Sequence, residues 1–186
     1  MFVVGCGGGV PVIAPPSPPP ARVSASTFES ANYRFRVAYP SGWVRSMSTA
    51  AKAAKPGELV FSVAFADPKG TVAGGSYVNA MQVSVYRRPA GGGTPRALAQ
   101  ELLTAYAARL PKVALGPTSW KPITMKRVSG FGLRYKYTVG SVEIWAQSIA
   151  LLRDDYAYLI TGQASAETWR TEWPRMSVTL GAFTLL

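Results

Sequence analysis

The sequence predicts an α+β fold in which two helices pack on an antiparallel sheet. Three observations lead to this class. Strand patterns come in runs instead of alternating with helices, short turn motifs join successive strands, and two segments carry an apolar stripe at helical spacing. A chain of 186 residues is long enough to bury a core within one domain.

The N-terminus resembles a lipid attachment site. Cys6 is the only cysteine, and it follows a Val-Val-Gly stretch and precedes three glycines. This pattern resembles the lipobox of bacterial lipoproteins, in which a signal peptide is removed before the cysteine and the thiol carries diacylglycerol. The resemblance implies that Cys6 anchors the protein outside the cytoplasmic membrane. Residues 1–5 are too short for a signal peptide, so this interpretation requires upstream sequence, and a free thiol is the alternative.

Residues 10–26 predict a disordered, proline-rich tether. Prolines remove backbone donors and enforce an extended conformation that does not pack. At about 3.1 Å per residue, the spacer after Cys6 reaches up to roughly 60 Å. We therefore divide the chain into a lipobox and linker over residues 1–27 and a folded domain over residues 28–186. A proline-rich ligand for an SH3-like domain is the alternative.

The first strand is predicted over residues 33–39. Alternation places its aromatic side chains on one face and Arg34 and Arg36 on the other. A Pro-Ser-Gly turn ends the strand.

A helix is predicted after two further strands, which cover residues 59–66 and 77–87. Thr94 supplies the N-cap and Pro95 the first helical position. Pro111 ends the helix. Its apolar residues recur every four positions, at Leu98, Leu102, Tyr106 and Leu110.

Four consecutive antiparallel strands follow. They are predicted over residues 120–128, 131–139, 142–152 and 156–163. The expected turns are Ser129-Gly130, Gly140-Ser141 and Arg153-Asp154-Asp155. The adjacent aspartates favour a turn over a catalytic or calcium-binding pair, because Asp side chains bond to their own backbone.

The last helix is predicted to start at Ser165. Pro174 is expected to kink it or divide it in two. The helix carries one apolar stripe, which predicts core packing for Trp169, Trp173, Met176, Leu180 and Phe183.

The segment Tyr39-Pro-Ser-Gly-Trp43 closes an aromatic-rich strand and resembles the opening of PsbP-like domains. This family includes the extrinsic photosystem II protein and small bacterial lipoproteins of the LpqN type. A mid-chain helix, a meander with a Tyr-x-Tyr-x-Ile-Thr strand at 156–161 and a terminal amphipathic helix also resemble it. The resemblance implies an α-β-α sandwich with a central antiparallel sheet, and non-catalytic work in docking to or assembling a membrane-associated complex. Trp43 is expected to pack under the strand corner.

The composition excludes several kinds of active site. With no histidine and one cysteine, the chain alone builds no Ser-His-Asp triad, His-ligated metal site, internal disulfide or Cys-rich zinc site. We predict no catalytic residue, metal or cofactor. The alternative is a small-ligand carrier or a two-carboxylate hydrolase between sheet and helix. Its carboxylates would have to converge by folding from Glu101, Glu143, Glu167 and Glu172.

The charge is strongly positive, with 20 Lys and Arg against 9 Asp and Glu, a net charge of +11. Alternation puts Arg134 and Lys136 on the face opposite Tyr135 and Tyr137. Basic and aromatic residues are therefore not expected to share one surface, which argues against nucleic acid, as does an extracytoplasmic location. Possible partner-binding residues are Arg34, Arg36, Arg134, Lys136, Trp120 and Trp145.

The predicted function is that of a lipid-anchored, extracytoplasmic binding or assembly module without catalytic activity. Its expected partner is an envelope protein, an anionic polymer or a lipid surface. The alternative interpretation of the charge is that it serves only solubility.

Overall fold

The computed structural model describes residues 24–49, 55–88, 94–110 and 120–186, apart from the side chains of Trp120 and Thr179. Cys6 and the proline-rich segment lie outside the described residues.

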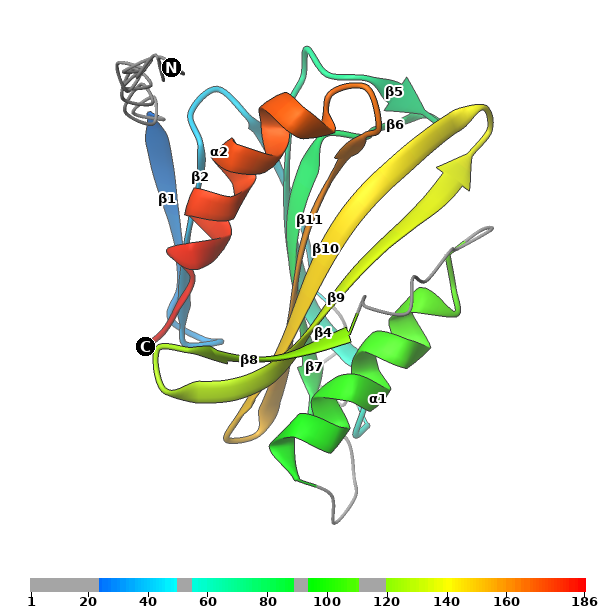
Figure 1. Cartoon of the computed structure of the whole chain (residues 1–186). Coiled ribbons are helices and arrows are strands. Elements are labelled where there is room, and N and C mark those ends of the chain that lie inside the picture. Colours follow the sequence, from blue (N-terminus) through cyan, green and yellow to red (C-terminus); the bar gives the residue numbers. More distant parts are fainter. Residues whose placement is uncertain (1–23, 50–54, 89–93, 111–119) are drawn as a thin grey trace, which may run out of the picture.

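A seven-stranded antiparallel sheet forms the centre of the molecule (Figure 1). Its strands, in spatial order, are β3 (Val44–Thr49), β4 (Leu59–Ala66), β7 (Ala80–Arg87), β11 (Tyr156–Ser165), β10 (Val142–Arg153), β9 (Val128–Val139) and β8 (Trp120–Met125). Pro122 is tolerated within β8 because this strand lies at the edge of the sheet.

Two smaller sheets accompany it. One contains β1 (Ala25–Ser30), β2 (Phe35–Pro40) and β12 (Thr184–Leu185), and the other is the short pair β5 (Val72–Ala73) and β6 (Ser76–Tyr77). The pairing of β12 with β2 brings the C-terminal segment beside the start of β2.

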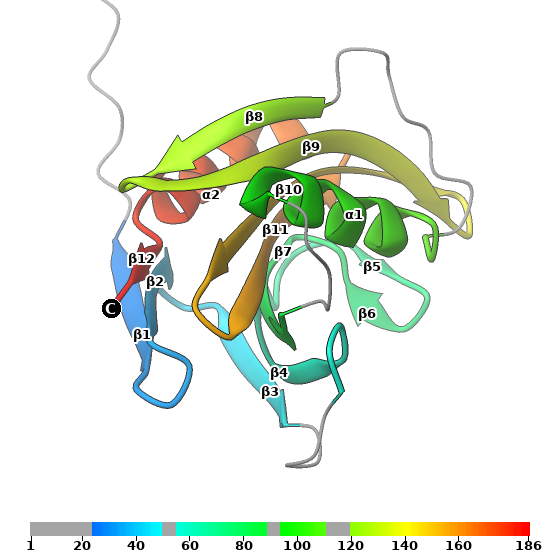
Figure 2. The same ribbon diagram turned by 90° about the horizontal axis from the view of Figure 1, so that it is seen from below.

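The elements form three layers (Figures 1 and 2). Helix α1 (Pro95–Ala107) covers one face of the large sheet over β9 and β10, and helix α2 (Trp169–Gly181) packs on the other face with β1 and β2. The predicted α-β-α sandwich with a central antiparallel sheet is therefore confirmed.

Each face of the sheet carries a separate apolar core. The core on the α2 side combines large residues of the sheet with the apolar stripe of α2, among them Phe35, Phe65, Ile160, Met176 and Phe183. The core on the α1 side lies under Leu98, Leu102 and Leu103 of the helix. Burial at about 25 cal/mol per Å² of apolar surface stabilises both layers.

Several predicted elements are confirmed. Strand β4 has the predicted bounds, and the turns at Gly140-Ser141 and Asp154-Asp155 lie where the sequence predicts them. Thr94 caps α1, because its hydroxyl accepts a hydrogen bond from the backbone nitrogen of Ala97. Trp43 is buried in the core on the α2 side, as expected.

The first turn of the meander was predicted wrongly. It lies at Lys126-Arg127, where both residues have positive φ, and not at Ser129-Gly130. Gly130 lies inside β9, where an added Cβ would meet the carbonyl oxygen of Ala150 at 2.2 Å. This glycine therefore permits a close approach between strands, which the sequence pattern did not distinguish from a turn.

Helix α2 also differs from the prediction. It begins at Trp169, because β11 continues through Ser165. The helix is continuous through Pro174.

Strands β1 and β3 were not predicted at all. Strand β1 begins at Ala25, ahead of the expected start at residue 28, and β3 consists entirely of exposed residues. Strand β3 therefore lacks the alternation of apolar and polar residues that identifies a half-buried strand, and in β1 Phe28 is the one apolar residue among the half-buried positions.

Candidate functional site

The register of β9 and β10 places three of the predicted site residues on one face of the sheet. The two-residue turn at Gly140-Ser141 pairs Trp145 with Lys136 and Gln147 with Arg134. Directly opposed residues in an antiparallel pair point to the same side. Trp145, Arg134 and Lys136 therefore all lie on the face that carries α2.

Helix α2 adds two tryptophans to this surface. Trp169 and Trp173 are stacked, with ring centroids 4.8 Å apart and planes 16° from parallel. The centroid of Trp145 lies 6.1 Å from that of Trp169. We call Trp145, Trp169 and Trp173 the tryptophan cluster. Trp145 is 41% exposed and the other two are half-buried.

Arg134 borders the tryptophan cluster. Its guanidinium carbon lies 5.6 Å from the ring centroid of Trp173, and its Nε donates a 2.7 Å hydrogen bond to Oε1 of Gln147. No described residue accepts a hydrogen bond from its two terminal nitrogens. The guanidinium is thus held in place while two of its nitrogens remain available to an anion.

Glu143 connects Trp145 with Lys136. One carboxylate oxygen accepts a 2.8 Å hydrogen bond from the Trp145 indole, and the other lies 2.9 Å from Nζ of Lys136. These two hydrogen bonds lower the pKa of Glu143 below its usual value. The carboxylate therefore stays ionised and fixes the Trp145 ring from one side.

This arrangement corrects one inference from the sequence. The tyrosines of β9 do face away from Arg134 and Lys136, as alternation predicts, and they lie under α1. The tryptophans, however, come from α2 and β10, so basic and aromatic side chains share one surface after all. The sequence signal was present in the Gly140-Ser141 turn, which sets the register of Trp145 and Lys136.

The two helix tryptophans also differ from the prediction of simple core packing. Met176, Leu180 and Phe183 are fully buried, whereas Trp169 and Trp173 pack at the margin of the core. The periodic stripe predicted which side of the helix faces the sheet. It did not predict that the first half of the helix lies near the margin.

Arg34 lies at the other end of the molecule and not on a strand. It has φ +50° in the turn before β2, and its side chain approaches Asp154 at 3.9 Å. The prediction that it shares a strand face with Arg36 is therefore wrong. We call the surface formed by Arg34, Lys126, Arg127 and Arg153 the hairpin end, because all four residues lie in or beside hairpin turns.

The remaining two predicted site residues are separate from both surfaces. Arg36 lies on β2 and forms an exposed ion pair with Glu29 at 2.7 Å. Trp120 begins the edge strand β8, in register with Leu133. Its side chain lies outside the described residues.

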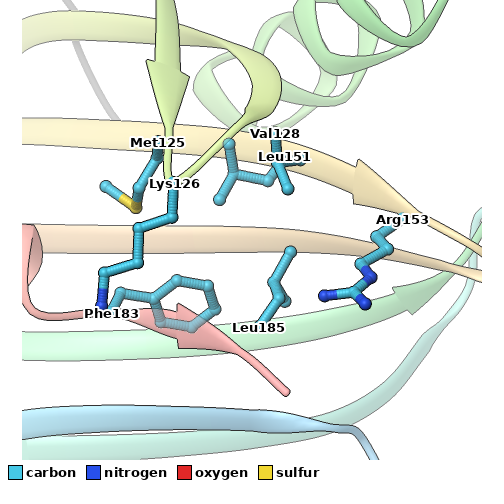
Figure 3. A pocket seen from close by; sticks show the side chains of 7 residues that line it. All are labelled: Met125, Lys126, Val128, Leu151, Arg153, Phe183 and Leu185. Carbon is cyan, nitrogen blue, oxygen red and sulfur yellow. The ribbon is translucent and has the colours of Figure 1, made fainter.

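Two hollows lined by described residues bear on the alternative of a ligand site between sheet and helix. A cavity of about 30 Å³, room for about one water molecule, lies between the β8–β9 turn and the C-terminal segment (Figure 3). Lys126 and Arg153 border it, and none of its lining residues is acidic. A hollow of about 460 Å³ lies along the outer face of α1, with Glu101 as its one acidic lining residue.

The four candidate glutamates are not gathered at one place. Glu101 lies on α1, on the other side of the sheet from Glu143 and Glu172. Within the described ranges, no three acidic or cysteine side chains are grouped closely enough to hold a metal ion. Neither described helix has the length and apolar character needed to cross a bilayer.

Comparison with solved structures identifies the fold. The chain resembles the solution structure of cyanobacterial PsbP (CyanoP) from Synechocystis, with a TM-score of 0.60 and 14% identity over 99% of both chains. It also resembles LpqN of Mycobacterium tuberculosis, which is described as involved in cell envelope biogenesis. There the TM-score is 0.53 and the identity 11%, over 88% of this chain and 91% of LpqN.

A structure from Bacteroides thetaiotaomicron has a TM-score of 0.51 and 10% identity, over 86% of this chain and 48% of that one. No protein-family model and no curated protein sequence matches the chain. At these identities the likeness shows the fold alone. The expected PsbP-like fold is confirmed, while the lipobox at Cys6 stays a prediction.

Proposed function

We propose that this chain is a non-catalytic binding module of the bacterial cell envelope. In this proposal a lipid on Cys6 anchors it outside the cytoplasmic membrane, and the proline-rich segment spaces the domain from its anchor. The tryptophan cluster and Arg134 form the surface that engages a membrane-associated or envelope partner.

The observation that carries the proposal is the tryptophan cluster with its bordering guanidinium. Tryptophan and arginine are the residues that most often dominate binding energy at protein interfaces. Here stacking and the hydrogen bond to Gln147 hold them in place before any partner arrives. A preformed surface loses little conformational entropy on binding.

The fold neighbours support the envelope location. LpqN, described as involved in cell envelope biogenesis, shares the fold. The lipobox resemblance at Cys6 is an independent argument for the same location.

The anchor is tested by detergent partitioning of the chain expressed with its native upstream sequence. We expect the wild type to enter the detergent phase and Cys6→Ser to release it into the aqueous phase. Unchanged partitioning of Cys6→Ser would refute the anchor.

The binding surface is tested by crosslinking in native membranes. A benzoylphenylalanine at Thr138, which opposes Glu143 beside the tryptophan cluster, is expected to yield a discrete adduct that Trp145→Ala removes. The control position is Thr104, on the outer face of α1 across the sheet. Equal adducts at both positions, or an adduct insensitive to Trp145→Ala, would contradict the proposed surface.

A further inference from the structure

We propose that the tryptophan cluster docks the domain onto a bilayer surface that contains anionic phospholipid. This inference deepens the proposed function and rests on it, because it identifies the partner of the cluster as the membrane that holds the anchor. Four observations on the described residues lead to it.

The first observation is the chemistry of the surface. Indole rings prefer the head-group level of a bilayer, because they combine an apolar ring with a polar N–H. Lysine and arginine beside them are attracted to anionic lipid, about fivefold in affinity for each well-placed cation. Trp145, half-exposed beside Arg134 and Lys136, has this composition.

The second observation is the local charge. Lys121 pairs in register with Gly132, on the same face as Arg134 and two residues from it along β9. Lys121 has no ion pair with any described residue. The acidic groups of this region are Glu143, which Lys136 and Trp145 engage, Glu172 on α2, which Arg175 engages at 3.3 Å, and Glu167 just before α2. Arg134 and Lys121 are therefore available to head-group phosphates.

The third observation is the position of the chain entry. Strand β12, after the end of α2, pairs with the start of β2, so the start of α2 lies toward the end of β2. Ala25, the first residue of β1, pairs with Pro40 at that same end. Figure 1 shows the beginnings of β1 and α2 at one end of the molecule. A lipidated N-terminal segment thus joins the domain at the end that carries the tryptophan cluster.

The fourth observation concerns the shape of the cluster. Trp169 and Trp173 are stacked on one another, so the cluster does not offer a row of separate ring faces to a planar ligand. A bilayer needs no such row, because ring edges can enter the head-group region. If a lipid on Cys6 anchors the chain, as proposed above, the linker of about twenty residues would also keep the domain near the membrane, at a high effective concentration.

The test uses vesicle co-sedimentation of the full chain carrying Cys6→Ser, so that binding reports the domain and not an attached lipid. We expect association with vesicles of equimolar phosphatidylcholine and phosphatidylglycerol, and weak association with phosphatidylcholine alone. Brominated phosphatidylcholine in the mixed vesicles should quench tryptophan fluorescence, and Trp145→Phe should reduce that quenching. Absence of binding to the anionic vesicles at low salt would overturn the inference.

A charge-matched pair of variants tests the orientation. Lys121→Gln with Arg134→Gln removes two cations beside the cluster, and Arg34→Gln with Arg127→Gln removes two at the hairpin end. We expect the first pair to weaken vesicle association by roughly 25-fold and the second to change it little. Equal losses would mean that the net charge acts as a whole, which contradicts docking through the cluster.

A binding assay with soluble polyglutamate separates this inference from the proposed function. If Arg134→Gln abolishes binding of soluble polyglutamate while the wild type ignores anionic vesicles, the surface takes an acidic protein and the membrane inference is wrong. The Thr138 crosslink and the Cys6→Ser partitioning do not depend on this vesicle result. Failure of the vesicle experiment alone would therefore leave the anchored binding module intact.

Discussion

At the scale of single residues, Tyr158 links the two layers on the α2 side. Its hydroxyl donates a 2.9 Å hydrogen bond to the carbonyl oxygen of Tyr33, and the side chain is 2% exposed. Burial, aided by the negative charge of Asp154, raises the pKa of Tyr158 to about 12. The folded state therefore retains a proton that the unfolded chain loses near pH 10.

This difference predicts a loss of stability in alkali. The contribution of Tyr158 is fully present below about pH 10 and is lost as the pH rises toward about 12, on the order of 2 kcal/mol. Urea titrations across this range should show the decline. Tyr158→Phe should be less stable at neutral pH by about 1 kcal/mol but should decline less steeply. An equally steep decline in the variant would assign the effect to other tyrosines, such as Tyr135 and Tyr137, whose pKa burial also raises.

Gly130 and Gly132 form a matched pair that tests the packing of β9 against its neighbours. A Cβ on Gly130 would lie 2.2 Å from the carbonyl oxygen of Ala150, whereas one on Gly132 would lie 3.4 Å from a methyl group of Ile123. We expect Gly130→Ala to cost about 3 kcal/mol and Gly132→Ala less than about 1 kcal/mol. Thermal or urea unfolding measures both. Similar costs would show that β9 shifts to accommodate a side chain at either position.

At the scale of elements, the β8–β9 turn places two cationic residues in a left-handed backbone conformation, which is unfavourable for residues with a side chain. Lys126 and Arg127 have φ +45° and +72°, a region that favours glycine or asparagine in two-residue hairpin turns. Arg127→Gly is expected to stabilise the fold by up to about 1 kcal/mol. Arg127→Asn should give a smaller gain, and chemical unfolding distinguishes the two. A destabilised glycine variant would show that the Arg127 side chain makes a contact that offsets the strain.

The elements also show where sequence reasoning succeeds. The turns at Gly140-Ser141 and Asp154-Asp155 and the strands β10 and β11 were predicted, because long apolar runs between turn residues identify buried strands. Strands β1 and β3 escaped prediction, because β3 is exposed throughout and Phe28 is the one apolar residue at the half-buried positions of β1. Their position depends on long-range pairing with β2 and β4.

The candidate site was predicted only in part, for a related reason. Arg134, Lys136 and Trp145 were identified separately, and local turn chemistry sets their register. Trp169 and Trp173 join these residues on one surface only because of the way α2 crosses the sheet. The spacing of residues within one helix does not encode that crossing.

At the scale of the whole molecule, the two ends differ in chemistry. The tryptophan cluster lies near the start of β10 and Arg153 at its end, roughly 26 Å away at the rise of an extended strand. At the hairpin end Arg34 and Arg153 both approach Asp154, whereas Arg134 has no carboxylate partner among the described residues. Lys126 and Arg127 at the hairpin end also have no ion pair with a described carboxylate, so what distinguishes the other end is that its cations lie beside exposed and half-buried tryptophans.

The seven-stranded sheet that both cores share also predicts how the molecule unfolds. Both cores pack on opposite faces of the same strands, so loss of one core should expose the sheet and release the other. Leu103→Ala removes a fully buried side chain of α1 and should cost about 2–5 kcal/mol. The four tryptophans whose side chains are described, at positions 43, 145, 169 and 173, all lie on the opposite, α2 face.

Tryptophan fluorescence therefore reports mainly on the α2 side, whereas far-ultraviolet circular dichroism reports the backbone structure of the whole molecule, α1 included. We expect Leu103→Ala to shift the urea midpoint of both signals equally, because the sheet transmits the loss from one core to the other. Met176→Ala, in the core beneath α2, is the matched control and should also move both signals together. A fluorescence midpoint that stays in place while the dichroism of Leu103→Ala shifts would mean that α1 unfolds as a separate unit and that the sandwich is not one cooperative structure.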